Sequence, residues 1–230
     1  MQLKNILILL FLALLYFPSC KKNQLKKPTD VSFKADINRA SNSSGSLIFT
    51  GGNINIAEFD IEGKRQQGDD ISFSKEFENG LLINFDPNNS IPEIDFDIPQ
   101  GIYESLEISF KTFENESDIT ITCLGEYTKN SGTIIPLQFE FMSSEYFSIS
   151  AEDDNGSANV TLDKDTPAIG LIIFDPIYWF EIIPPSSLEN ASLTELNGIE
   201  TLLINESANE NLYELIVSRI EESTEIFFGH

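Results

Sequence analysis

Residues 168–183 read AIGLIIFDPIYWFEII, and nearly every residue between Ala168 and Phe174 is apolar. A strand that is covered on both faces has such a continuous apolar composition, whereas a strand with one wet face alternates between apolar and polar residues. The stretch therefore predicts a central β-strand at 168–174. It also requires another element of the chain to cover the second face of this strand.

The chain before this strand alternates between apolar and polar residues from Val31 onward. An alternation of period two is typical of strands with one face in a core and the other in water. The apolar positions that share a face are Val31, Phe33, Ala35 and Ile37; Ile119, Ile121 and Cys123; Leu137, Phe139 and Phe141; and Phe147, Ile149 and Ala151. Because Cys123 belongs to such a face, we expect its thiol to be buried and unreactive.

Turn sequences separate these segments at short intervals, and no helical period is found between residues 31 and 185. The turns include Gly51-Gly52, Asn79-Gly80, residues 99–101 and residues 153–157. Ten or eleven short strands punctuated in this way predict a mainly β protein. We expect an antiparallel β-sandwich, either immunoglobulin-like or a related Greek key.

One segment departs from the simple alternation. In NINIAEFDIEG, residues 53–63, the apolar positions change parity between Ile56 and Phe59. A β-bulge, which adds one residue to one strand of a pair, returns the following side chains to the inner face. We therefore expect a bulge near Ala57.

The apolar period changes again in the C-terminal part of the chain. Steps of three and four residues define one helical stripe, made of Leu212, Leu215, Ile216 and Ile220. Ser207 and Glu210 have the spacing of a capping box, so a helix is predicted from about 209 to 226. The same spacing at Ser186 and Glu189 predicts a shorter helical turn, and IETLLI at 199–204 predicts an edge strand. We expect this C-terminal helical segment, about 186–228, to pack on the sandwich and cover the strand at 168–174.

The N-terminus reads MQLKNILILLFLALLYFPSC, with Lys4 ahead of an apolar run at 6–17. Twelve apolar residues are too few for a transmembrane helix, which needs roughly 20. A basic start, a short apolar middle and the small residue Ser19 instead predict a secretory signal peptide at 1–19. Cys20 follows directly, and this arrangement resembles the bacterial lipoprotein signal. The resemblance implies that the Cys20 sulfur receives a diacylglyceryl group; the alternative is an ordinary signal with an incidental cysteine.

Residues 20–30 are interpreted as a lipidated basic tether that joins the anchor to a single domain at 31–230. Four lysines lie within it, Lys21, Lys22, Lys26 and Lys27. Each can contribute about 1 kcal/mol next to an anionic leaflet. The expected partner of this segment is thus the membrane, reached through the lipid anchor. Lysines directly after the cysteine, where surface-exported relatives of this kind carry acids, favour the periplasmic face of the outer membrane.

The charge of the remaining chain excludes one class of partner. From Asp30 onward, nine basic residues stand against all 37 acidic residues, a net charge of −28. Binding of nucleic acid relies on basic residues that neutralise phosphates, so no nucleic-acid partner is expected. A well-solvated acidic exterior is the simplest interpretation of this charge.

Catalytic motifs are missing from the sequence. The single histidine is the last residue, His230, which removes the central member of serine and cysteine hydrolase triads and of histidine metal sites. No glycine loop matches a phosphate-binding motif. We therefore predict no catalytic residues, no cofactor and no enzyme activity. A glycoside hydrolase that uses two carboxylates is the distant alternative.

Two acidic clusters are candidates for calcium, because carboxylate and carbonyl oxygens suit hard cations. One is formed by Glu152, Asp153, Asp154 and Asn155, and the other by Glu93, Asp95 and Asp97. Neither has the spacing of an EF-hand loop. A solvated hairpin turn and a polar strand face are the preferred interpretations, so no metal site is predicted and the calcium question stays open.

Aromatic residues after the central strand allow two interpretations. Tyr178, Trp179 and Phe180, near Pro176 and Pro184, are suited to stack on sugar rings. The chain also holds 18 phenylalanines, which suit a large core. We prefer a core plug at the end of the buried strand. A carbohydrate-binding accessory lipoprotein is the alternative function.

The sequence resembles a group of uncharacterised Bacteroidota-type envelope lipoproteins with a β-sandwich body. The resemblance is carried by the Cys20 start, IPQGIYESLEISF at 98–110, FDPIYWF at 174–180 and INESANENLYELI at 204–216. It implies a lipid-anchored protein of the cell envelope. We expect a non-catalytic binding or scaffolding module with an unknown protein or glycan partner.

Overall fold

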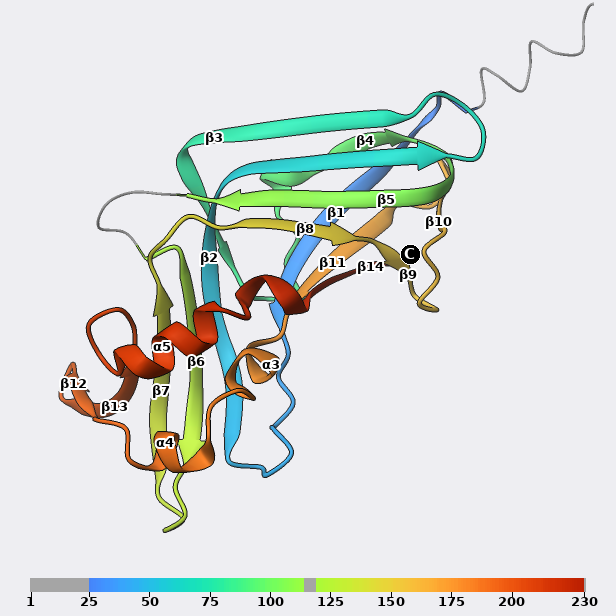
Figure 1. Cartoon of the computed structure of the whole chain (residues 1–230). Coiled ribbons are helices and arrows are strands. Elements are labelled where there is room, and N and C mark those ends of the chain that lie inside the picture. The colour runs from blue at the N-terminus through green and yellow to red at the C-terminus, as the bar shows by residue number, and fades with distance from the viewer. Residues whose placement is uncertain (1–24, 114–118, 230) are drawn as a thin grey trace, which may run out of the picture.

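The structure, a computed structural model, describes residues 25–113 and 119–229 of the chain (Figure 1). The predicted signal peptide at 1–19 and the predicted lipidation site Cys20 lie outside the described residues. The strands are β1 (Pro28–Ile37), β2 (Leu47–Arg65), β3 (Ile71–Asn84), β4 (Phe96–Pro99), β5 (Gly101–Thr112), β6 (Ile121–Thr128), β7 (Ile134–Phe141), β8 (Tyr146–Ser150), β9 (Glu152–Asp153), β10 (Val160–Leu162), β11 (Ala168–Phe174), β12 (Thr194–Leu196), β13 (Ile199–Ile204) and β14 (Thr224–Gly229). The helices are α3 (Pro176–Phe180), α4 (Pro185–Glu189), α5 (Glu210–Val217) and the 3₁₀ turns η1 (Pro92–Ile94) and η2 (Ile220–Ser223).

In the described part of the chain the strands form two sheets. The smaller sheet has five strands in the order β4-β1-β11-β14-β9. The larger sheet has nine, along the path β10-β5-β2-β6-β7-β13-β12, with β3 attached to β2 and β8 attached to β5. The prediction of a mainly β protein is thus confirmed.

The prediction of a purely antiparallel arrangement is wrong, because both sheets are mixed. β1 runs parallel to β11, β13 runs parallel to β7, and β14 runs parallel to β9. Alternation of apolar residues reports which face of a strand is buried, and it is the same for parallel and antiparallel neighbours. The direction of pairing therefore leaves no trace in the pattern that predicted the strands.

The strand that was expected at the centre does lie there. β11 is the middle strand of the five-stranded sheet, between β1 and β14. Its residues Ala168, Gly170, Ile172 and Phe174 are buried, whereas the side chains that alternate with them are partly exposed. The C-terminal segment does not cover that second face. It pairs with the edge of β11 instead, as β14.

β2 runs through both halves of the larger sheet. Its second half, from Ile56 to Arg65, pairs with β5, and its first half, from Leu47 to Ile54, pairs with β6. Gly52, with φ of +143°, lies in the first half opposite Cys123, and a side chain there would begin 1.9 Å from the carbonyl oxygen of Thr122. Glycine is the residue that permits this close approach of two backbones.

The bulge near Ala57 is confirmed. The register between β2 and β3 shifts between Ile56 and Glu58, and the register between β2 and β5 shifts at the same place. On β3 the partners of these two residues are Leu81 and Glu76, so four residues, 77–80, stand opposite Ala57. The irregularity lets Ile54, Ile56, Phe59 and Ile61 all be buried despite their change of parity.

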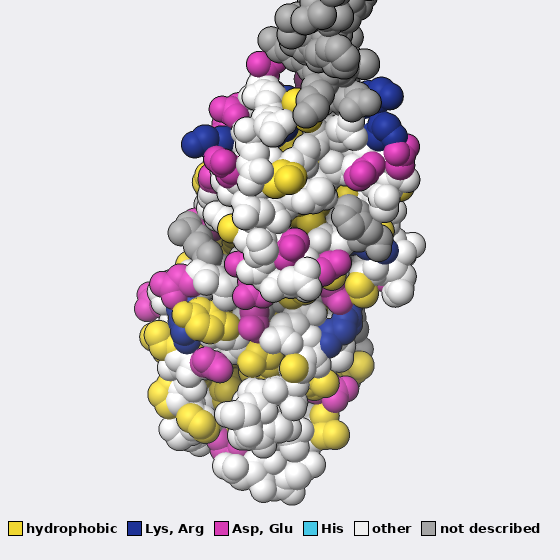
Figure 2. Space-filling view, turned by 90° about the vertical axis from the view of Figure 1, so that its right-hand side faces the viewer, with side chains coloured by type: hydrophobic (Ala, Val, Ile, Leu, Met, Phe, Trp, Pro, Cys, Tyr) yellow, Lys and Arg dark blue, Asp and Glu magenta, His cyan; other side chains and the backbone are white. Residues whose placement is uncertain are grey.

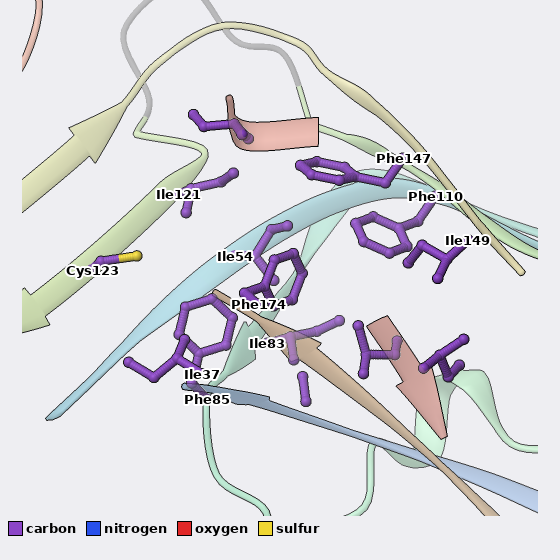
Figure 3. Packing of buried hydrophobic residues seen from close by; sticks show 14 of the residues in the cluster. Ile37, Ile54, Ile83, Phe85, Phe110, Ile121, Cys123, Phe147, Ile149 and Phe174 are labelled. Carbon is purple, nitrogen blue, oxygen red and sulfur yellow. The ribbon is translucent and has the colours of Figure 1, made fainter. Parts of the chain in front are cut away.

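Phenylalanine side chains join the two sheets. Phe174 of β11 contacts Phe110 of β5 and Phe147 of β8, with ring centroids 5.9 Å apart in each case. Phe33 of β1 lies 5.0 Å from Phe59 of β2 in the same way. Figure 3 shows Phe110, Phe147 and Phe174 facing one another between strands of the two sheets. Edge-to-face and offset ring pairs of this kind add about 0.5–1.5 kcal/mol each beyond the burial of their area.

Helices cover the inner face of the lower half of the larger sheet (Figure 1). Phe139 of β7 contacts Trp179 and Phe180 of α3 and Tyr213 of α5, with centroids 6.1 to 6.3 Å apart. Phe49 of β2 completes this group at 5.1 Å from Phe180. The larger sheet is thus covered by the smaller sheet at one end and by helices at the other.

The helix predicted from about 209 to 226 forms only in its first half. α5 ends at Val217, and residues 224–229 form the strand β14. Neither predicted capping box forms: Asn209 and Pro184 precede α5 and α4, and neither provides a side-chain cap. Asn205 accepts from the backbone N–H groups of Ser207 and Ala208, and this local turn takes the place of the expected cap.

Deletion of residues 224–230 is expected to abolish cooperative folding, because it removes an interior strand. The deletion exposes β11 along one edge and takes away the buried side chains of Ile226 and Phe228, each contributing about 1.5–3 kcal/mol. These losses approach the whole stability of a typical domain, about 5–15 kcal/mol. Circular dichroism during heating measures the effect. A chain that lacks only His230 keeps every described β14 pair and is the control; equal melting temperatures for the two deletions would contradict the placement of β14.

Candidate functional site

A buried arginine marks the end of the molecule at which the described chain begins. Arg65 is the last residue of β2, and its side chain is only 8% exposed. The register between β2 and β5 shifts next to it, so that Arg65 pairs with Tyr103 and both side chains point to the inner face. Buried charges require hydrogen-bond partners, because loss of hydration otherwise costs several kcal/mol.

The partners of Arg65 are backbone carbonyl oxygens from three separate segments. Its Nη1 donates to the carbonyl of Leu25 at 2.7 Å and to that of Gln100 at 3.3 Å, while Nε donates to that of Asp69 at 2.7 Å. Leu25 precedes β1, Gln100 lies between β4 and β5, and Asp69 lies between β2 and β3. A hydrogen bond to a charged donor contributes about 1.5–3 kcal/mol, so the guanidinium fixes these three segments to one another. We call this arrangement the Arg65 clamp.

Two neighbouring features complete the Arg65 clamp. Gly68, with φ of +108°, lies against the guanidinium, and a Cβ at this position would lie 2.8 Å from Cζ of Arg65. The hydroxyl of Tyr103 donates to the carbonyl of Pro99 at 2.6 Å, which holds the turn that carries Gln100. Backbone bonding continues the attachment, since the N–H of Gln100 donates to the carbonyl of Lys27 at 2.9 Å.

Sequence reasoning missed Arg65, although a signal was present. Phe59, Ile61 and Gly63 occupy inward positions of β2, and Arg65 has the same parity. A charged residue that continues an apolar face is a candidate for a buried structural contact. We expected the tether to end at Asp30, whereas the structure attaches the chain to the body from Leu25 onward.

A cavity of about 270 Å³ opens beside the Arg65 clamp. Amide and apolar groups line it, namely Leu25, Gln66, Gln67, Gln100, Gly101, Ile102, Thr161 and Leu162. Ile102 is 44% exposed. Charges of both signs surround this end: Lys64 lies 3.9 Å from Glu104, Lys164 pairs with Asp165, and Lys26 and Lys27 are exposed.

The acidic cluster at 93–97 is only partly brought together. Asp95 and Asp97 line a cleft of about 380 Å³ with Asp30, whereas Glu93 belongs to the 3₁₀ turn η1. Burial raises the pKa of Asp95, while the ammonium of Lys75 acts in the opposite direction. Lys75 donates to the carbonyls of Glu93 and Asp95 at 2.8 and 2.9 Å.

The second acidic cluster forms a turn that begins at the end of β9. The Oδ1 atom of Asp153 accepts from the N–H groups of Asn155 and Ser157 at 2.9 and 2.8 Å, and these bonds lower its pKa. A carboxylate engaged in this way stabilises its own turn. Across residues 25–113 and 119–229, no group of three or more histidine, cysteine or acidic side chains is arranged to hold a metal ion.

The aromatic residues after β11 belong mostly to the core. Trp179 is fully buried and Phe180 is 2% exposed, as the core interpretation predicts. Tyr178 is partly exposed, yet the guanidinium of Arg219 covers its ring at 3.8 Å and its hydroxyl donates to Glu222 at 3.2 Å. These three residues therefore do not present a free aromatic platform for sugar rings.

A smaller cavity of about 180 Å³ lies between the β1–β2 loop and helices α3 and α4. Its apolar floor includes Leu47, Phe180 and Leu188, and its rim carries the hydroxyls of Ser44 and Ser46. The two hydroxyl oxygens lie 2.7 Å apart and bond to one another. The rim polar groups thus satisfy each other within the protein.

The structure describes only one of the two cysteines, Cys123. Cys123 is fully buried in β6, and burial raises the pKa of its thiol far above the usual range. The prediction of a buried thiol is confirmed, and its elevated pKa makes it a poor nucleophile. Cys20, the predicted lipidation site, lies outside the described residues and stays a prediction.

No helix among the described residues is long and apolar enough to cross a bilayer. Comparison of the chain with protein-family models, with curated proteins and with solved structures finds no match.

The stability of the protein is expected to fall as the pH rises from 10 to 12. Burial raises the pKa of Tyr103, Tyr127 and Tyr213 to about 12, and Glu189 and Glu206 add to the effect at the latter two. Unfolded tyrosine loses its proton near pH 10, so the folded state binds these protons more tightly. The three tyrosines therefore make their full contribution to the free energy of unfolding below pH 10, and this contribution decreases between pH 10 and pH 12.

Urea denaturation at successive pH values, with tyrosinate absorbance alongside, measures this loss. Tyr103→Phe keeps the ring but cannot ionise, and its stability should decline less steeply than that of the unsubstituted protein. If all three tyrosine-to-phenylalanine variants declined as steeply as the unsubstituted protein, the assignment would be contradicted.

Proposed function

We propose that this protein is a non-catalytic lipoprotein of the cell envelope, anchored through Cys20, whose β-sandwich body binds or scaffolds a protein partner. The observation that carries the proposal is the Arg65 clamp. It attaches the chain to one end of the body at Leu25, five residues after Cys20. A lipid at Cys20 would then lie next to a defined end of the molecule.

The description of the body as a β-sandwich is supported by the contacts between its sheets. Phe33, Phe110, Phe147 and Phe174 interdigitate across the two sheets, as inner-face side chains do in sandwiches. The helices α3 and α5 extend the same core over the lower half of the larger sheet. The proposal therefore treats residues 31–230 as one body.

The end far from Leu25 is the proposed partner-binding end. Ile134 and Ile199 are 59% and 56% exposed. β13 runs parallel to β7 with Leu202 beside Leu137, so these two isoleucines, each three residues earlier, lie at the same end of the sheet. Figure 2 shows hydrophobic side chains gathered in the lower half of the face that it presents. Exposed apolar groups with polar neighbours are typical of protein-binding surfaces.

The location is proposed to be the periplasmic face of the outer membrane. The support is the run of lysines after Cys20, which favours retention near an anionic leaflet. The strongly acidic body, by contrast, is repelled by that leaflet only within a screening length of about 8 Å. The anchor and the lysines thus oppose the charge of the body.

Replacement Cys20→Ala is expected to abolish fatty-acid labelling and to release the protein into the soluble fraction. Two or three acyl chains hold a protein stably on a membrane, and their loss leaves no comparable anchor. Radiolabelled palmitate and cell fractionation measure both effects. Cys123→Ala, which removes the buried thiol, should leave labelling unchanged. Label that persists in Cys20→Ala would reject the lipid anchor.

A photo-crosslinking residue at position 134 or 199 should capture a partner in intact cells, because both side chains are exposed at the proposed binding end. The same residue at Glu62, which is exposed on the other half of the larger sheet, is the control. Mass spectrometry of the adducts identifies the partner. Equal adducts at position 62, or none at 134 and 199, would argue against this binding end.

A further inference from the structure

We propose that the end of the body around the Arg65 clamp rests directly on the phospholipid headgroups, with Ile102 and the 270 Å³ cavity facing the bilayer. The proposal rests on the proposed lipid anchor at Cys20 and adds an orientation to it. Its partner is an anionic phospholipid surface. The surface involved comprises Leu25, Lys26, Lys27, Gln66, Gln67 and Ile102.

The length of chain between the anchor and the Arg65 clamp limits the height of the body. Five peptide units join Cys20 to Leu25, and fully extended they span about 18 Å. The fourteen residues of β3 alone extend for about 46 Å. Because the tether is shorter than half of that strand, the clamped end must stay close to the bilayer and the opposite end must point away.

The Arg65 clamp is what keeps the tether short. From Leu25 onward the chain is held by the guanidinium, and from Pro28 onward it pairs with β4. Without the guanidinium contact, the next attachment is the carbonyl of Lys27, which accepts from the N–H of Gln100. The free chain then grows to seven residues, about 25 Å when extended. Arg65 is therefore a positioning residue for the whole body.

The chemistry of this end suits contact with headgroups. Ile102 is 44% exposed beside the cavity, and an exposed apolar side chain gains by entering the interfacial region. Lys26 and Lys27 are exposed, and neither forms an ion pair with a described residue, so both are free to meet lipid phosphates. Gln66 and Gln67 also line the cavity and can hydrogen bond to phosphate or glycerol oxygens.

Acidic residues at this end weaken the attraction but do not cancel it. Glu104 and Asp165 have lysine partners, and Asp70 accepts from the backbone N–H of Arg65 at 3.3 Å. Asp69 and Asp163 are exposed and remain as uncompensated negative charges. The contact thus depends on the short tether and on Ile102 as much as on charge, and moderate salt should weaken it only in part.

Hydrogen exchange on a chemically anchored protein tests the proposal. Because the thiol of Cys123 is buried, a maleimide phospholipid is used to label Cys20 in the chain from residue 20 onward. The coupled protein is bound to vesicles of equal parts phosphatidylcholine and phosphatidylglycerol and compared with the uncoupled protein. We expect exchange of amides at 66–70 and 101–102 to slow about tenfold, and amides of the turns at 130–133 and 197–198 to stay unchanged.

Three variants separate the contributions. Arg65→Ala should lose the protection at 66–70 because its longer tether lets the body move away from the bilayer. Arg39→Ala is the matched control, since Arg39 also donates to backbone carbonyls, those of Thr50 and Phe85, at a different place in the fold. Ile102→Ser changes an exposed side chain, so it should fold normally and lose part of the protection even if Arg65→Ala fails to fold.

The outcomes are distinct from those that test the lipid anchor. Protection at 130–133 or 197–198, or no protection anywhere on vesicles, would overturn the proposed orientation. Protection that Arg65→Ala and Ile102→Ser both retain would equally overturn it. Because the lipid is coupled to Cys20 chemically, the vesicle experiment tests the orientation of the body independently of acylation in cells. Either result can be obtained whether or not cells acylate Cys20.

Discussion

The continuity of β2 is the constraint on which the rest of the structure depends. This one strand carries the inner face against the smaller sheet in its second half and the inner face beneath the helices in its first half. Gly52 and the bulge at Ala57 let it change course without turning its apolar residues outward. The two zones of packing therefore share a backbone, and disturbing one should affect the other.

β2 also ends at Arg65, the charge that organises the end of the body at which the described chain begins. The guanidinium of Arg65 bonds to three backbone carbonyls instead of to a carboxylate. That choice matters in a chain with a net charge of −28 beyond its tether, where an acidic partner would add to the repulsion. The fold thus uses neutral acceptors for its buried guanidinium.

The strand faces could be predicted from sequence, because burial of one face leaves an alternation along each strand. Val31, Phe139 and Phe147 are buried as predicted. The direction of pairing could not be predicted, since parallel and antiparallel neighbours produce the same alternation. β14 was missed because Ile226 and Phe228 provide only one step of period two after a helix. In the candidate site, Cys20 could be predicted because its motif is local in sequence. The role of Arg65 could not be predicted, because it depends on a contact with Leu25, 40 positions earlier in the chain.

The open edge of β3 has a consequence for copies of this protein at high concentration. Among the described strands β3 pairs only with β2, and an unpaired edge of fourteen residues invites another chain to add to the sheet. Lys75 points from this strand across Phe96, 4.5 Å from the ring, and the extra residues opposite Ala57 interrupt the edge. To pair with the edge of β3, a strand of a neighbouring copy would have to bury the Lys75 ammonium and straighten the interruption opposite Ala57. Neighbouring copies at high density should therefore stay separate rather than grow into fibres.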